Sequence, residues 1–213
     1  MIDLRYAGRP LPRLASIGLV LTVILLVLPT AAIALALGIG LLALPYELDL
    51  VLRRLPLIFP LHMITAALAL ILIPIAAFAR RRHGVHRALG RLAAAAVVLG
   101  GLTALPVALA SEALPVARAG LFVQGVVWLA LLALAVAAIR RREIERHARF
   151  MLAMAAVASG AIWLRLTTFA ALSLGLPFDP VYAAAAWACW LLPLGLVMIA
   201  TSRFEPVERP MPA

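Results

Sequence analysis

Six long apolar runs occupy most of this chain, and their length constrains its fold more than any other feature. A helix that crosses a bilayer needs roughly 20 consecutive, mostly apolar residues. The chain is 66% hydrophobic and only 13% charged, which is far more apolar surface than a soluble domain of this size can bury. The pattern predicts an all-α polytopic transmembrane bundle with six membrane-spanning helices, over residues 14–44, 57–79, 88–110, 115–139, 148–173 and 180–201.

The order of these runs also indicates how the helices are organised. We expect one integral membrane domain over residues 1–213, with short tails at 1–13 and 202–213. Spans two to five are predicted to form a four-helix core within residues 57–200. Spans one and six are predicted to pack on the outside of that core.

Span one is longer than a bilayer crossing requires. Pro29 or the Gly38/Gly40 pair is therefore predicted to kink it or to end it early. Its apolar stretch also far exceeds the roughly 7–15 residues of a signal-peptide core. We expect an uncleaved first span.

The arginines assign an orientation to the bundle. All nineteen basic residues are arginines, and fifteen of them lie in the two tails and in the loops after spans two and four, including the helix starts. The opposite loops hold three: Arg53, Arg54 and Arg118. Because short cytoplasmic loops are rich in basic residues, both termini and both arginine-rich loops are predicted to be cytoplasmic. We expect the protein in a bacterial plasma (inner) membrane.

The positive charge indicates a membrane surface as the partner. The net charge of +10 does not indicate nucleic acid, because the arginines form short blocks between apolar runs instead of one polar face. Such blocks suit anionic lipid headgroups at the cytoplasmic interface of the bilayer. The single Cys189 excludes an intrachain disulfide. The pattern leaves the oligomeric state open.

Two arginine-rich loops are nearly alike. The first runs from Arg80 to Arg87 and the second from Arg140 to Arg149, sixty residues later. Spans two and three thus align with spans four and five, as a parallel repeat about an axis along the membrane normal would require. The alternative is chance similarity between segments rich in alanine, leucine and arginine, and both interpretations stay open.

Three polar residues, His62, Gln124 and Arg165, lie inside predicted spans. Polar and ionisable groups in a span are costly, so each is a candidate for function. Counted along ideal helices, the three fall in one layer near the outer face, where they would meet in the bundle. The alternatives are an Arg165 that snorkels to the outer headgroups, and ordinary interhelical contacts of about 0.6 kcal/mol for the other two.

Two histidines, His86 and His147, begin spans three and five at the inner face. Two neutral imidazoles across a bundle are what a b-type haem needs for its iron, with Arg87 or Arg91 on the propionates. The alternative is that these histidines and arginines bind anionic headgroups. His147 shares a helix face with Met151, Met154 and Arg165, whereas His86 leads a face of small residues that allows either close approach of a helix or room for a macrocycle: Gly90, Ala93, Val97, Gly100 and Ala104.

The order of these motifs resembles an uncharacterised set of predicted membrane proteins, the domain of unknown function family 2306. The resemblance rests on a histidine early in one span (His62), an H-R-x-x-G-R block over residues 86–91 and a later block that begins at His147. An intramembrane arginine, here Arg165, follows that later block. The chain departs from the family pattern at Ala148 and Phe150, where arginine and tryptophan are expected. The resemblance covers about residues 57–200 and implies no activity.

A looser resemblance is to diheme b-type cytochromes, whose four-helix core ligates one haem from its first and third helices and another from its second and fourth. By this resemblance His86 and His147 would be the second pair. His62 lies on the first core helix, but the third offers only Phe122 or Gln124, so one haem at most is implied.

The sequence therefore leaves three functions open. The first is binding of one b-type haem for membrane electron transfer, with a redox partner or quinone. The second is a small transporter or channel with an outer His62/Arg165 vestibule. The third is a non-catalytic membrane protein that binds lipid or a protein partner. The spans contain no catalytic constellation of nucleophile, base and acid, so no enzymatic activity is assigned.

Overall fold

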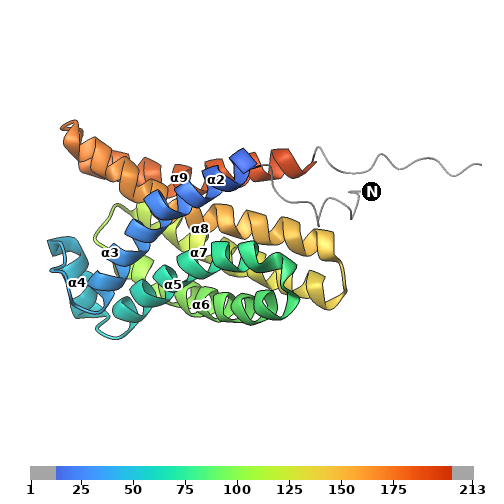
Figure 1. Ribbon diagram of the computed structural model, residues 1–213. Coiled ribbons are helices and arrows are strands. Elements are labelled where there is room, and N and C mark those ends of the chain that lie inside the picture. Colours follow the sequence, from blue (N-terminus) through green and yellow to red (C-terminus); the bar gives the residue numbers. More distant parts are fainter. Residues whose placement is uncertain (1–12, 203–213) are drawn as a thin grey trace, which may run out of the picture.

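The computed structural model describes residues 13–202, and these residues fold into helices without a strand (Figure 1). Six helical segments are long and apolar enough to cross a membrane, which confirms the predicted fold class. The predicted tails lie outside the described residues except for Arg13 and Ser202. In chain order the elements are α2 (Arg13–Thr22), η1 (Val23–Val27), α3 (Leu28–Gly38), α4 (Tyr46–Arg54), α5 (Ile58–Phe78), η2 (Ala79–Arg81), α6 (His83–Ala110), α7 (Pro115–Arg140), α8 (Ile144–Ser173) and α9 (Phe178–Ser202).

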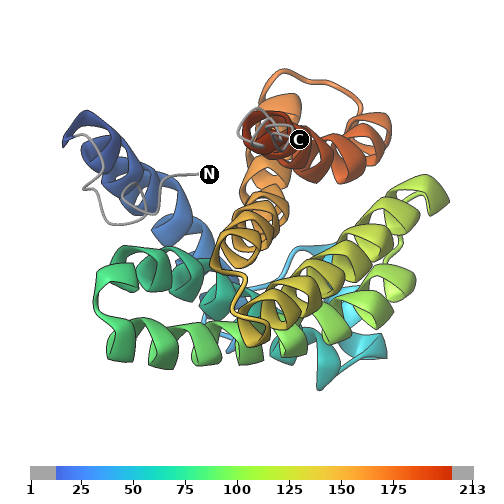
Figure 2. The same cartoon turned by 90° about the vertical axis from the view of Figure 1, so that its right-hand side faces the viewer.

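Four helices, α5 to α8, form the centre of the bundle as two hairpins. Each of these helices packs against the next one along the chain, α3 packs on the outside of α5, and α9 packs against α8 and α7 (Figures 1 and 2). The first span lies outside these four helices, as predicted, whereas the last span joins their buried core. We call the end that carries the connections 79–82 and 141–143 the arginine end, and the opposite end the far end.

The buried core is shared by five helices. Met154, Val97 and Val157 are its largest fully buried side chains, and Trp128 and Leu132 of α7 pack with them. Trp190 of α9 belongs to the same cluster, so the sixth span closes the core as well as covering it.

Glycines allow the helices to approach closely. A methyl group placed on Gly120 of α7 would lie 2.9 Å from the backbone oxygen of Ala186 and 2.9 Å from Nε1 of Trp187, both on α9. The same indole donates a hydrogen bond to the carbonyl oxygen of Val116 at 2.9 Å. In lipid there is little hydrophobic force between helices, so van der Waals contact at such small residues holds them together.

The first span ends earlier than predicted. Its helix runs from Arg13 through a π-helical segment and stops at Gly38, six residues before the predicted end at residue 44. Gly40 has a φ of 78° and closes the helix as a left-handed cap. Pro29 is the second residue of α3, directly after the π-helical segment, where the change of hydrogen-bond pattern can accommodate its missing N–H. The span ends early at the predicted Gly38/Gly40 pair.

The short helix α4 was not predicted, because its nine residues are too few and too charged to cross a membrane. Its acids occupy the first turn and its arginines the last turn, as the helix dipole favours. Val51 is buried beside α3 and α5. Arg54 pairs with Glu112 and donates to the carbonyl oxygen of Ala110, which ties α4 to the end of α6.

Two core helices begin before their predicted starts. α6 begins at His83 instead of residue 88, and α8 begins at Ile144 instead of residue 148. The first turns of these helices therefore contain residues that the pattern assigns to loops, such as His83 and Arg146. Arg142 lies before α8 with a φ of 62°, a conformation more typical of glycine, and ends α7 with a left-handed cap.

We predict that Gly120→Ala destabilises the protein by about 1–3 kcal/mol, because the added methyl group must displace the α9 backbone or the Trp187 indole. Thermal unfolding of the detergent-purified protein measures the effect. Gly195→Ala on α9 is the matched control, since nothing lies within 4 Å of its added methyl group. A variant at Gly120 that unfolds at the wild-type temperature would contradict the packing described.

Candidate functional site

His86 and His147 occupy equivalent positions in the two hairpins. His86 lies in the first turn of α6, and its Nδ1 is 2.8 Å from the carbonyl oxygen of Ala76 near the end of α5. His147 lies in the first turn of α8, and its Nδ1 is 2.9 Å from the carbonyl oxygen of Ala135 in α7. A carbonyl oxygen can only accept, so Nδ1 carries the proton and donates in both rings. Each imidazole thus ties the two helices of its own hairpin together.

This shared contact is relevant to the sixty-residue repeat. In both hairpins a histidine in the first turn of the second helix donates a hydrogen bond to a carbonyl oxygen near the end of the first helix. Similar strings of residues therefore make similar structure. Whether the two hairpins arose by duplication stays a prediction.

The haem interpretation of these histidines receives no support from the packing. The Nδ1 tautomer leaves Nε2 free, which suits an iron ligand. However, the helix faces that would enclose a macrocycle belong to one buried cluster, which also includes Trp128 and Leu132 of α7. Met154 of the His147 face and Ala93 and Val97 of the His86 face lie in the same buried cluster. The small residues of α6 thus serve close helix approach, the other of the two predicted uses.

The remaining residues of the predicted cofactor site lie on the surface. Arg87 and Arg91 are exposed on α6, and within residues 13–202 neither forms an ion pair. The same described residues contain no group of three or more histidine, cysteine or acidic side chains that could hold a metal ion. Cys189 is buried, with its Sγ 3.9 Å from Oγ1 of Thr167.

A second polar group lies towards the far end. His62 of α5 is half-buried, and its Nδ1 lies 3.0 Å from the carbonyl oxygen of Gly100 and 3.5 Å from Oγ1 of Thr103, both on α6. Gly100 permits this approach, since a methyl group there would lie 3.3 Å from the backbone nitrogen of Ala66. The Nδ1–H donates to the carbonyl group, so Nε2 of His62 carries a lone pair.

Arg165 of α8 joins this group through its charge. The guanidinium lies within electrostatic range of His62 on α5 and of Tyr182 on α9. Its Nη1 donates a 2.8 Å hydrogen bond to the carbonyl oxygen of Ala161, one turn closer to the middle of the bundle. The side chain is exposed at the protein surface. Arg165 therefore points away from the nearer end of its helix, which is the reverse of a snorkelling arginine.

Gln124 does not join His62 and Arg165. Its Nε2 donates to the carbonyl oxygen of Val157 at 3.0 Å, and the amide packs over Gly160, where an added methyl group would lie 2.6 Å away. Val157 is eight residues before Arg165, or about 12 Å along the helix. Gln124 thus makes an interhelical contact in a deeper layer, and the predicted single layer contains only the other two residues.

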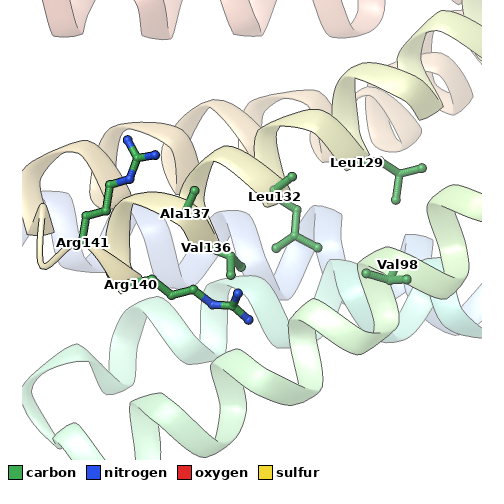
Figure 3. A pocket seen from close by; sticks show the side chains of 8 residues that line it. Val98, Leu129, Leu132, Val136, Ala137, Arg140 and Arg141 are labelled. Atoms are coloured by element: carbon green, nitrogen blue, oxygen red, sulfur yellow. The ribbon is translucent and has the colours of Figure 1, made fainter.

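Two cavities lie away from these histidines. One is a groove of about 540 Å³ along α6 and α7 at the arginine end, and it contains Arg140 and Arg141 (Figure 3). The other is a cavity of about 420 Å³ at the far end, between the end of α3 and α4. Its one charged side chain, Asp49, is paired with Arg53 at 2.8 Å.

Comparison with known proteins identifies the family of this chain. The family DUF2306, described as predicted membrane protein, matches residues 59–201. The chain belongs to this family. No curated protein and no solved structure matches it. Together with the six candidate spans, the match identifies this DUF2306 protein as an integral membrane protein.

Sequence reasoning missed three residues at or near the sites of this DUF2306 protein. Thr103 could have been found, because it and His62 are almost equally far from the turn at residue 82 and so lie at the same level in the hairpin. Tyr182 lies near the start of span six, and no pattern separates it from the other aromatic residues at helix ends. Trp128 is buried, and its Nε1 has no hydrogen-bond partner within the described residues. No sequence pattern distinguishes it from an ordinary core tryptophan.

We predict that His86→Ala and His147→Ala each lower the free energy of unfolding by about 1 kcal/mol, because each removes one interhelical hydrogen bond. The two losses should add, since the sites lie in separate hairpins. Thermal unfolding in detergent measures both. His83→Ala is the control, because His83 is exposed and should be neutral.

A different result would restore the haem interpretation. If protein from haem-replete cells has a Soret band that sharpens on reduction and is lost in either histidine variant, the imidazoles ligate iron instead of closing the hairpins.

Proposed function

We propose that this DUF2306 protein binds a small anionic ligand within the membrane, at a site formed by Arg165, His62 and Tyr182 near the far end. A site at this depth, with helices on several sides, suits a small transporter or channel. The proposal extends the predicted outer vestibule of His62 and Arg165 by adding Tyr182.

The direction of the Arg165 side chain is the observation that carries this proposal. A guanidinium in a span normally escapes to the headgroups, because a charge in hydrocarbon is costly. Here it donates to Ala161, one turn deeper, and within residues 13–202 it has no carboxylate partner. An anionic ligand would supply the negative charge that the protein does not.

The neighbouring groups support an anion that can carry a proton. Arg165 offers a planar set of donors suited to a carboxylate or phosphate. The Tyr182 hydroxyl can donate a further hydrogen bond. Nε2 of His62 has a lone pair that can accept a proton from an acidic ligand. We therefore infer a weak organic acid or a phosphate as the ligand class.

Electron transfer through a haem, with a quinone or redox partner, has weaker support. It requires space between the His86 and His147 faces, and these faces share one buried core. The donor atoms are suitable, but the packing around them does not favour a macrocycle.

We also infer that the arginine end faces the cytoplasm of a bacterial cell, with both termini on that side. The support is the concentration of arginines there and the position of Glu47, Asp49 and Glu112 at the far end. The Arg165 site would then open towards the outer half of the membrane.

We predict that this orientation appears in cysteine labelling of a Cys189→Ala background. An impermeant maleimide should label Pro177→Cys on intact cells, because this exposed residue lies in a far-end loop. Gly84→Cys, at the arginine end, has open space around it and should be labelled only after lysis. The reverse pattern would overturn the orientation.

We predict that phosphate, sulfate, acetate or benzoate, compared at constant ionic strength, stabilises the purified protein and that Arg165→Gln abolishes the effect. A ligand at 100 times its Kd adds about 2.7 kcal/mol of stability, so the melting temperature should rise by several degrees. Thermal unfolding in detergent measures the shift.

The matched control is Arg118→Gln, which removes a half-buried far-end arginine that donates to the carbonyl oxygen of Leu109. This variant should keep the full response. If none of the four anions stabilises the wild type, or if the Arg165 variant responds equally, the proposed site is wrong.

A further inference from the structure

The groove at the arginine end has the shape of a site for one lipid chain. It lies along α7 and is lined by apolar side chains between Leu129 and Ala137, with Val98 contributed by α6 (Figure 3). Val98 is 40% exposed, so the groove opens to the outside of the bundle and not into its core. In a membrane, that outside is the hydrocarbon region.

The length of the groove matches one leaflet. From Leu129 to Arg140 is eleven residues, or about 16 Å of helix. The hydrocarbon core of a bilayer is about 30 Å thick, so one leaflet contributes about 15 Å. A lipid chain that begins beside Arg140 would therefore reach the midplane close to Leu129.

Charge is concentrated at one end of this groove. Arg140 and Arg141 line it, both are exposed, and within the described part of the chain neither is paired with a carboxylate. Their guanidinium groups point to opposite sides of α7, with Arg140 on the side where Val98 lies (Figure 3). Arg91 is two helical turns before Val98 on the same face of α6. Two helices thus bring cations to the mouth of the groove.

We propose that this groove binds one anionic phospholipid of the leaflet at the arginine end, with a chain along Leu132 and Val136 and the phosphate at Arg140. Charge complementarity selects the headgroup, because unpaired arginines at a membrane surface attract anionic lipid and bind phosphate oxygens. The apolar lining selects a lipid over a soluble anion. This site is separate from the Arg165 site and does not depend on it.

The test measures binding of phosphatidylglycerol to the whole protein in phosphatidylcholine nanodiscs, with bound lipid counted by native mass spectrometry. Arg140→Gln/Arg141→Gln should weaken binding of this lipid by about 10- to 30-fold, because each arginine near the surface contributes to its attraction. Ala137→Phe, which fills the groove and keeps the arginines, should also reduce binding several-fold.

The matched control is Arg80→Gln/Arg82→Gln, which removes the same charge from the other loop at the arginine end without touching the groove. This variant should bind phosphatidylglycerol within about twofold of wild type. If it loses as much binding as the groove arginine variant, or if Ala137→Phe binds normally, the attraction is diffuse and the site is overturned. Unchanged melting temperatures show that each variant is folded.

Discussion

Close contact between helix backbones is the constraint on which the rest of this structure depends. A bilayer offers little hydrophobic force to bring apolar helices together, so association relies on short-range packing. Gly101, Gly120 and Gly160 each lie where an added methyl group would clash with a neighbouring helix. The same closeness at Gly100 brings its carbonyl oxygen within reach of His62. The candidate site near the far end is therefore a product of the packing.

Five polar side chains of the spans share one pattern of hydrogen bonding. Each donates to a backbone carbonyl oxygen, so its hydrogen bond needs no second polar side chain. The donor is thereby satisfied in a medium without water. For a neutral imidazole or amide this contact is sufficient. For the charged Arg165 it is not, since a carbonyl group leaves the positive charge uncompensated. The pairs are His62 with Gly100, His86 with Ala76, Gln124 with Val157, His147 with Ala135, and Arg165 with Ala161.

The spans could be predicted from the sequence because crossing a bilayer requires a minimum apolar length, which composition reveals directly. The helix α4 could have been found as well, from acids in its first turn and arginines in its last. The direction in which a side chain points could not be predicted from the sequence. Whether His86 faces His147 or its own hairpin depends on which helix lies closest to it. The spacing of residues along one helix does not predict the distance between two helices. The depth of Gln124 relative to Arg165 was misjudged for the same reason.

The contacts made by His86 and His147 have a consequence for how the chain is built into a membrane. Each joins residues only ten or twelve positions apart, so each can form as soon as the first turn of the returning helix is made. Neither contact requires any other part of the protein, so each central hairpin can close by itself. Biogenesis can proceed by inserting helices in pairs, and the first and last spans need only attach to hairpins that have already closed.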